Sequence, residues 1–310
     1  MQIEVEGVVP LRFADGAPVR AASAVVPFDA GWLVVQDDAT HAAWVSHPDG
    51  RAPVRRVRVL PAVEGHDTFE ESAGTKRLKP DLEAAFSVPG TADVVLLGSG
   101  SSPARMRACR LGRASCGDAP DVAVADLAPL YAAVAHALGE PEDRVNLEGA
   151  CVLGGTVRWF QRGSPAAGVP TAAVDVRLDT LLRVLAGDVD PGAVRFEAVH
   201  RYDLGEARGV GLAVTDAVTL ADGRVLVSAA AEDTPDPRED GPVVGSVLAV
   251  LDDLAVEHTA PLPHVEGGVP KVEGLAIVSQ DAPGDVRLLA TLDADDATAP
   301  SLAVTLRARW

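Results

Sequence analysis

The chain has 310 residues, of which 47% are hydrophobic and 4% aromatic, and it carries 27 basic and 45 acidic residues. A chain of this length buries about three quarters of the surface that its unfolded form exposes, so neither a disulfide nor a metal is needed merely for folding. The formal charge of −18 argues against nucleic acid and against an anionic membrane surface as partners, because both are bound through clusters of Lys and Arg.

The first residues, MQIEVEGVVPLR, alternate apolar and polar side chains and lack the basic and long apolar regions of a secretory signal. No run reaches the roughly 18 apolar residues of a membrane span. Three cysteines, Cys109, Cys116 and Cys151, have no CxxC spacing, which suits a reducing compartment. We therefore expect a cytoplasmic protein, in which Cys109 and Cys151 are buried apolar side chains rather than reactive thiols.

A motif that opens an apolar strand with an acidic residue recurs along the chain. Its clear copies are Asp81–Ala85, Asn146–Ala150 and Lys271–Leu275, and weaker copies begin at Arg20 and Arg208. The aligned positions are 22, 83, 148, 210 and 273. Their spacings of 61, 65, 62 and 63 residues divide the chain into five units.

Within these units the motif strand is followed by short apolar runs bounded by turn residues and by outer runs that alternate polar and apolar residues. The last unit lacks an outer strand, and Ile3–Leu11 has the pattern to supply it. Two inserts, Leu127–Leu138 and Leu178–Leu185, have helical apolar spacing. The strands expected after the motif strands are, in chain order, Trp32–Asp38, Val54–Pro61, Asp93–Gly98, Ala104–Leu111, Val122–Leu127, Val157–Gln161, Thr171–Leu178, Val194–Leu204, Arg224–Ser228, Val243–Leu251, Leu254–Pro261, Val286–Ala290 and Ser301–Arg307.

This pattern predicts an all-β fold, a single closed β-propeller over residues 1–310 with five blades and short helical inserts. Closure by the N-terminal strand would remove the exposed sheet edges that otherwise promote aggregation. Six blades and a β fold other than a propeller remain as alternatives. The expected units are approximately 20–78, 79–143, 144–207, 208–270 and 271–310 together with 1–19.

Acidic residues are expected to gather at one mouth of the central channel. In a propeller the innermost strands start near the axis at one face, and the second strands return to that face, so Glu83, Glu148 and Glu273 should meet the residues that follow the second strands. Carboxylates around one axis repel one another unless a positive charge lies between them. The acidic residues expected there after second strands are Asp37, Asp38, Glu232, Asp233, Asp293, Asp295 and Asp296.

Two sources of positive charge fit this ring. One is a hard divalent cation, and Ca²⁺ in particular, because it prefers carboxylate and amide oxygens. The other is the protein's own basic side chains. Arg20, Arg208 and Lys271 share one position of the repeat, and Arg162 follows a second strand, so these four are the expected ligand-binding residues. A structural alternative is that the glutamates brace neighbouring blades by accepting backbone N–H bonds.

The expected catalytic residues are Glu148, Asp38 and His41. His41 follows Asp38 by three residues in the same predicted loop, where neighbouring carboxylates would raise its pKa toward the physiological range. A solvated loop histidine is the alternative role. Motifs of other enzyme classes, such as GxSxG, HExxH and GxxxxGK[ST], do not occur in the sequence.

The segments Val145–Ala150 and Lys271–Ile277, with an Asp-rich turn about twenty residues after the second, resemble the bacterial phytase-like and esterase-like propellers, and especially an uncharacterised bacterial group among them. Related propellers of the gluconolactonase and senescence-marker type place a Glu and Asn or Asp residues around a divalent metal at the channel mouth. The resemblance therefore implies Glu83, Glu148, Glu273 and Asp296 as metal ligands, with Asp38 in support.

The function that follows is a metal-dependent hydrolase of a small ester, lactone or phosphoester, in which the cation polarises the scissile group and a carboxylate activates water. The alternative is a propeller without catalysis that binds a small ligand or a protein partner through the same face. Neither function involves nucleic acid or a membrane.

Overall fold

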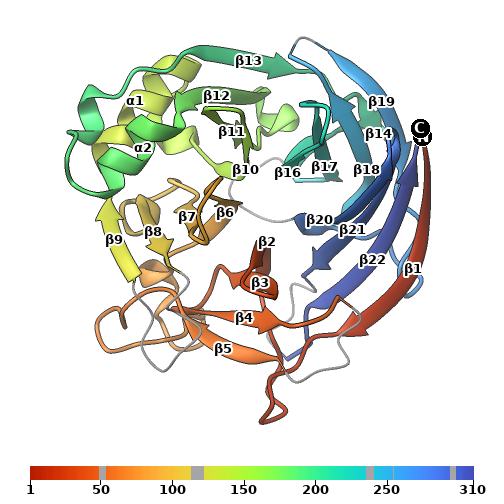
Figure 1. Ribbon diagram of the computed structural model, residues 1–310, viewed down its shortest axis with the longest axis horizontal. Helices are drawn as coiled ribbons and strands as arrows, with labels where there is room; N and C mark the ends of the chain where they lie inside the picture. Colours follow the sequence, from red (N-terminus) through yellow and green to blue (C-terminus); the bar gives the residue numbers. More distant parts are fainter. Residues whose placement is uncertain (49–53, 113–121, 235–240, 254, 294–297) are drawn as a thin grey trace.

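The computed structural model describes residues 1–48, 54–112, 122–234, 241–253, 255–293 and 298–310. Its strands form five four-stranded antiparallel sheets arranged around one axis (Figure 1). This is a five-bladed β-propeller. The predicted all-β fold with five blades is confirmed, and the alternatives with six blades or without a propeller are excluded.

The blades follow one another along the chain, each from its innermost to its outermost strand. Blade 1 contains β2 (Ala22–Phe28), β3 (Gly31–Gln36), β4 (His41–Val45) and β5 (Arg55–Arg58). Blade 2 contains β6 (Leu82–Ser87), β7 (Val94–Gly98), β8 (Arg107–Leu111) and β9 (Val122–Asp126). Blade 3 contains β10 (Leu147–Leu153), β11 (Thr156–Gln161), β12 (Thr171–Arg177) and β13 (Ala198–Tyr202). Blade 4 contains β16 (Ala213–Thr219), β17 (Val225–Glu232), β18 (Val243–Leu251) and β19 (Val256–Pro261).

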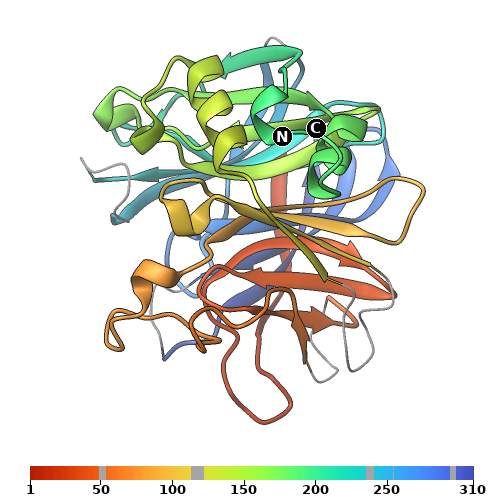
Figure 2. The same cartoon turned by 90° about the vertical axis from the view of Figure 1, so that its left-hand side faces the viewer.

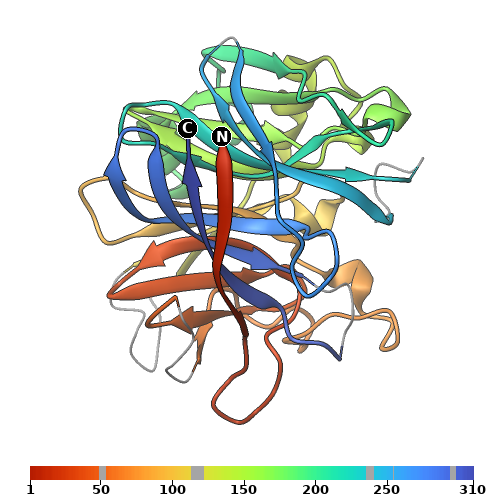
Figure 3. The ribbon, with the colours of Figure 1, turned by 90° about the vertical axis from the view of Figure 1, so that its right-hand side faces the viewer.

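Blade 5 is built from both ends of the chain. Its inner strands are β20 (Val272–Ala282), β21 (Asp285–Leu292) and β22 (Leu302–Arg309), and its outer strand is β1 (Gln2–Pro10). The β1 strand runs antiparallel to β22, from Gln2 opposite Arg309 to Pro10 opposite Leu302, and the two chain ends lie side by side (Figure 3). The predicted closure of the last blade by the N-terminal strand is confirmed.

Two helices cover the outer part of blades 2 and 3 (Figures 1 and 2). They are α1 (Ala128–Leu138) and α2 (Leu178–Leu185), as the apolar spacing predicts. The α1 helix ends where Gly139 adopts a left-handed conformation with φ of 74°, which residues with a side chain rarely adopt. Its buried face packs into the core between the two blades, where Tyr131 meets the edge of Trp159. None of the helices in the described ranges is both long and apolar enough to cross a membrane.

The apolar core lies between neighbouring blades, because side chains alternate between the two faces of each sheet. In β2, for example, Ala24, Val26 and Phe28 pack toward blade 2, and Val25 packs toward blade 5. Cys109 and Cys151 are buried in this core, and burial raises the pKa of each thiol to about 12. Both are therefore unreactive apolar side chains, as expected. Cys116 lies outside the described residues.

The innermost strands β2, β6, β10, β16 and β20 surround the axis, and each contacts the next until β20 meets β2. Every one of them has a shift in pairing register near its start, which marks a β-bulge. The Ser23 hydroxyl donates to the Leu82 carbonyl at 2.5 Å, and the Thr215 hydroxyl donates to the Val272 carbonyl at 2.5 Å, so both link one bulge to the next blade. The residues at the five shifts are Ser23, Glu83, Glu148 with Gly149, Thr215 and Glu273.

The positions of these bulges show that the repeat alignment predicted from the sequence was wrong in two units. Ser23 and Thr215 occupy the position of the motif glutamate, where the sequence pattern favoured residues 22 and 210. In blade 4 the error is five residues, because β14 (Glu206–Ala207) and β15 (Val210–Gly211) form a separate hairpin before β16 begins. The apolar residues of that hairpin have the same sequence pattern as the start of an innermost strand.

Gly149 allows blades 3 and 4 to approach closely at the axis. Its φ of 77° is left-handed, and a Cβ atom there would lie 2.8 Å from the Cα atom of Asp216. Gly154, in the β10–β11 turn, also has a left-handed φ of 61° but has open space around it. Substitutions at Gly149 and Gly154 can therefore be compared to separate the destabilisation due to backbone strain from the destabilisation due to contact between blades.

We predict that Gly149→Ala lowers the free energy of unfolding by about 1–3 kcal/mol more than Gly154→Ala, because only the first also forces two blades apart. Urea denaturation followed by circular dichroism measures both. Equal destabilisation by the two variants would show that the blade contact contributes nothing.

Candidate functional site

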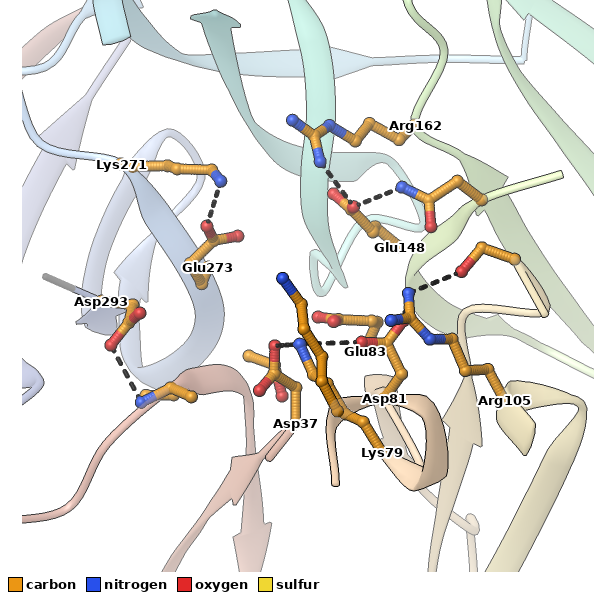
Figure 4. Close-up of a pocket in the computed structure, with 16 residues that line it drawn as sticks. Asp37, Lys79, Asp81, Glu83, Arg105, Glu148, Arg162, Lys271, Glu273 and Asp293 are labelled. Atoms are coloured by element: carbon orange, nitrogen blue, oxygen red, sulfur yellow. Dashed lines mark hydrogen bonds and ion pairs between the residues drawn. The ribbon is translucent and has the colours of Figure 1, made fainter. Parts of the chain in front are cut away.

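Charged side chains enclose a cavity of about 130 Å³ at the end of the channel where the innermost strands begin (Figure 4). We call it the mouth cavity. Its walls include acidic and basic groups in nearly equal number, so it is not an open ring of carboxylates. The lining residues are Ala21, Ala22, Ser23, Asp37, Lys76, Lys79, Asp81, Glu83, Ser101, Arg105, Asn146, Glu148, Arg162, Lys271, Glu273 and Asp293.

Lys79 binds two carboxylates on the side of blades 1 and 2. Its Nζ atom lies 2.5 Å from Oδ2 of Asp37, just after β3, and 2.9 Å from Oδ1 of Asp81, just before β6. Burial lowers the pKa of Lys79, but the two carboxylates outweigh it and raise the pKa well above its ordinary value. Asp81 also accepts hydrogen bonds from Arg105 at 3.0 Å and from Ser99 at 2.5 Å. The Lys79 ammonium is thus a fixed positive charge inside the cavity.

Glu83 lies beside this group and has no hydrogen bond or ion pair within the described part of the chain. One carboxylate oxygen from each of Asp37, Asp81 and Glu83 lies within 4.8 Å of the others. Burial, followed by the charges of Asp81 and Asp37, raises the pKa of Glu83 well above its ordinary value. Burial also raises the pKa of Asp37 to about 7, against the effect of Lys79. Oδ1 of Asp37 is buried without a hydrogen-bond partner among the described residues.

A second ion network joins blades 3, 4 and 5. Arg162, after β11, bonds Glu148 at 3.1 Å and also pairs with Glu232 at the end of β17. Lys271, before β20, lies 3.2 Å from Glu232 and 2.9 Å from Glu273. Glu232, at the end of a strand in blade 4, therefore links a cation of blade 3 to a cation of blade 5.

Glu148 is the most perturbed carboxyl group of this network. Oε1 accepts a hydrogen bond from Asn146 at 2.9 Å in addition to the Arg162 contact, whereas Oε2 is buried without a partner among the described residues. Burial raises the pKa of Glu148 to about 8, since it outweighs the opposing effect of Arg162. Burial likewise raises the pKa of Glu273, although Lys271 lowers it. Near neutral pH the cavity therefore contains carboxyl groups poised to gain or lose a proton.

The structure brings seven of the residues singled out from the sequence to the mouth cavity: Asp37, Glu83, Glu148, Glu273, Asp293, Arg162 and Lys271. The three glutamates do not form one compact ligand group, because Glu148 and Glu273 pair with their own cations and Glu83 sits with Asp37 and Asp81. Asp295 and Asp296 lie outside the described residues.

Six other residues singled out from the sequence do not line the mouth cavity: Arg20, Asp38, His41, Arg208, Glu232 and Asp233. Asp38 turns toward Arg20 at 3.2 Å, so these two pair with each other beside it. His41 already begins β4, away from the axis, and its ring packs against Phe13. Burial, aided by Arg56, lowers the pKa of His41 to about 4, which is opposite to the expected direction. Arg208 is exposed at the turn of the β14–β15 hairpin, and it therefore does not share a repeat position with Lys271.

Sequence reasoning missed Lys79 and Arg105, which lie outside the repeated motif. A compositional signal was present, because the chain has only three lysines among its 27 basic residues. All three, Lys76, Lys79 and Lys271, line the mouth cavity. A compact ammonium group fits between two carboxylates at such a site, whereas the larger planar guanidinium of Arg needs more space.

A family model matches residues 75–297, which is most of the chain. The chain belongs to DUF6910, a family of unknown function. The matched region of this DUF6910 protein includes Lys79, Glu83, Glu148 and Lys271, and so covers most of the mouth cavity. The comparison with curated protein sequences gave no match.

Several solved structures are similar to this DUF6910 protein at low sequence identity. The glutaminyl cyclase of Myxococcus xanthus is 11% identical with a TM-score of 0.46, over 99% of this chain and 97% of that one. A hypothetical protein from Leishmania major is 14% identical with a TM-score of 0.46, over 97% of this chain and 90% of that one. A luciferin-regenerating enzyme is 10% identical with a TM-score of 0.44, over 98% of this chain and 96% of that one. The function therefore has to be argued from the mouth cavity itself.

We predict that Glu148→Gln becomes more stable relative to the wild type as the pH rises from 5 to 8. The folded wild type keeps the proton of Glu148 up to a pKa of about 8, whereas the unfolded chain loses it near its ordinary pKa, so between these two values a rising pH favours the unfolded wild type, in which Glu148 is ionised. The difference should grow by at most about 1.4 kcal/mol per pH unit.

Urea titrations at several pH values measure this difference. Glu142→Gln is the matched control, because Glu142 is exposed and lies away from the cavity. A constant difference between Glu148→Gln and the wild type across this range would contradict the raised pKa.

Proposed function

We propose that this DUF6910 protein is a hydrolase of a small ester, lactone or phosphoester that reacts in the mouth cavity. The proposal rests on one observation: carboxyl groups with pKa values near neutrality, those of Asp37 at about 7 and Glu148 at about 8, line the same cavity as fixed cations. A group whose pKa lies near the working pH is best suited to transfer protons in both directions.

The cavity residues supply each role that such a hydrolysis needs. Glu148 in its protonated form can donate a proton to the leaving oxygen, and Asp37 in its ionised form can accept one from the attacking water. Lys79, Arg162 and Lys271 can stabilise the negative charge that develops on the substrate oxygen. Since a water molecule occupies about 30 Å³ of liquid, a cavity of about 130 Å³ admits an acyl or phosphoryl group but not a large substrate.

Asp37, Asp81 and Glu83 are the residues that would hold a divalent cation. Their chemistry fits, because three carboxylate oxygens lie within 4.8 Å of one another, Oδ1 of Asp37 lacks a partner among the described residues, and Glu83 is unpaired there. A bound cation would polarise the scissile group. The Lys79 ammonium already touches two of these carboxylates, so it competes with such a cation.

We predict that Lys79→Met lowers stability by about 3–5 kcal/mol, since it leaves the buried Asp37 without its cation and Asp81 with Arg105 alone. We also predict that Ca²⁺ then raises the melting temperature more in this variant than in the wild type, because the competing ammonium is gone. At about 100 times its dissociation constant the cation should add roughly 2.7 kcal/mol, which is a shift of a few degrees.

Thermal melts with chelator and then with Ca²⁺, Mg²⁺, Mn²⁺ or Zn²⁺ provide the measurement. Lys76→Met serves as the control, because the Lys76 side chain is 61% exposed and its ion pair among the described residues is with the exposed Glu71 at 3.6 Å. If no cation shifts the melt of Lys79→Met, the carboxylates do not form a cation site.

For activity, we predict that the purified protein hydrolyses at least one of p-nitrophenyl acetate, δ-valerolactone and p-nitrophenyl phosphate. Glu148→Gln and Asp37→Asn should each lower kcat/KM about 100-fold or more, as expected when an acid or base is removed. Glu142→Gln should retain full activity. Absence of turnover of all three substrates, with each of the four cations supplied, would overturn the proposed hydrolase.

Binding without turnover is the second candidate function. It is favoured by the pairing of Lys79, Arg105, Arg162 and Lys271 with carboxylates, since cations held in ion pairs keep their side chains in place. Saturable binding of the uncleaved esters would support this candidate. A protein partner at the same face would be recovered by a pull-down that Glu148→Gln weakens.

A further inference from the structure

The far end of the channel has a second cavity of about 280 Å³, lined by all five innermost strands. We call it the apolar cavity. It lies beyond the bulges, between the later residues of β2, β6, β10, β16 and β20. The lining residues are Val25, Val26, Pro27, Ala85, Phe86, Ser87, Pro89, Ala150, Cys151, Val152, Ala217, Val218, Thr219, Leu275, Ala276 and Ile277.

The side chains that line this cavity offer a ligand little that is polar. No residue in the lining is charged, in contrast to the mouth cavity. The two hydroxyl groups are occupied, because Ser87 donates to the Pro27 carbonyl at 3.2 Å and Thr219 donates to the Val152 carbonyl at 2.8 Å. The Cys151 thiol stays protonated, since burial raises its pKa to about 12.

The sequence explains why one channel has two different ends. Each innermost strand has a charged or hydroxyl-bearing residue at its bulge, and small or apolar residues follow it in four of the strands, as in Glu83-Ala84-Ala85-Phe86 and Glu273-Gly274-Leu275-Ala276-Ile277. In β16 the buried Asp216 comes between Thr215 and Ala217, where it accepts a hydrogen bond from the Leu275 N–H at 2.6 Å and does not line the apolar cavity. Between the two cavities, Gly149 and Gly274 bring neighbouring blades so close that a Cβ atom would meet backbone atoms at 2.8 and 2.7 Å. The channel is therefore narrow between its polar and apolar parts.

We infer that the apolar cavity binds an uncharged, apolar organic molecule of about the size of naphthalene. Apolar side chains dominate the lining, and a cavity of about 150 Å³ lined by apolar side chains binds benzene. The present cavity has nearly twice that volume and falls near the lower end of the range for small-molecule sites. A charged molecule is disfavoured, because the lining has no charged side chain to compensate for its lost hydration.

This site is independent of the proposed hydrolase, because no residue lines both cavities. The bound molecule can thus be an effector or a cargo molecule, whether or not hydrolysis takes place in the mouth cavity. The test therefore measures binding alone.

The probe is N-phenyl-1-naphthylamine, which is uncharged at neutral pH and becomes fluorescent in apolar surroundings. We expect one saturable site per chain. Its sulfonated analogue, 8-anilinonaphthalene-1-sulfonate, has the same rings and one negative charge, and we expect it to bind at least tenfold more weakly. Equal binding of the two probes, or no saturable binding of the uncharged one, would overturn the inference.

Variants place the bound probe in the cavity. Ile277→Glu puts a carboxylate into the lining and should weaken binding of the uncharged probe at least tenfold. Val124→Glu is the matched control, since Val124 is 43% exposed on β9 outside the cavity, and it should leave binding unchanged. Unchanged binding by Ile277→Glu would overturn the assignment.

Two further variants give a result if Ile277→Glu fails to fold and show which of the two cavities holds the probe. Ala85→Leu fills part of the apolar cavity without adding charge and should also weaken binding, so it gives the result if Ile277→Glu fails to fold. Glu148→Gln should bind the uncharged probe as the wild type does. Loss of probe binding in Glu148→Gln would place the probe at the mouth instead, and would overturn the inference without bearing on hydrolysis.

Discussion

The convergence of five innermost strands on one axis is the constraint on which the other features depend. Strands that meet edge to edge leave little room for side chains, so the residues at the closest approach are small, as Gly149 and Gly274 show. The bulges next to them turn one residue per strand out of the regular pleat. In three blades that residue is a glutamate, and in the other two it is a hydroxyl residue that bonds the neighbouring blade.

The mouth cavity is the electrostatic consequence of this geometry. Glutamates placed at the bulges are forced together in a small, poorly hydrated space, where burial raises the pKa of Glu83, Glu148 and Glu273. Lysine and arginine side chains from the loops limit the repulsion, and Glu232 in turn links two of these cations. Because burial is the largest cause of each shift, the carboxyl groups remain perturbed even where a cation touches them.

Much of the fold could be predicted from the sequence, because periodicity and repeat spacing are local properties of the chain. The motif glutamates of blades 2, 3 and 5 were found for the same reason, since they stand at a fixed place in a repeated pattern. The position of Arg208 was wrong because a hairpin inserted before β16 has the composition of a strand start. Lys79 and Arg105 could not be found by repeat, because they come from loops that differ between blades and reach the cavity only through the folded path of the chain.

The surroundings of His41 also could not be predicted from the sequence pattern, because they depend on how the chain folds. Asp37 and Asp38 lie close to it in sequence, but in the fold burial, followed by the charge of Arg56, lowers its pKa and outweighs the opposing effect of Asp67. A titratable group responds to the charges and the solvent around it, whatever their distance along the chain. Sequence spacing was therefore a good guide to strand positions and a poor guide to ionisation.

The distribution of lysine gives the molecule an unusual chemical selectivity. Because all three lysine side chains line the mouth cavity, amine-reactive reagents have no lysine target elsewhere on the surface. Lys76 is well exposed, whereas Lys79 and Lys271 are largely buried in ion pairs, so among the lysines acylation should begin at Lys76, at the rim of the cavity. A dye coupled to Lys76 would lie beside any ligand bound in the mouth cavity.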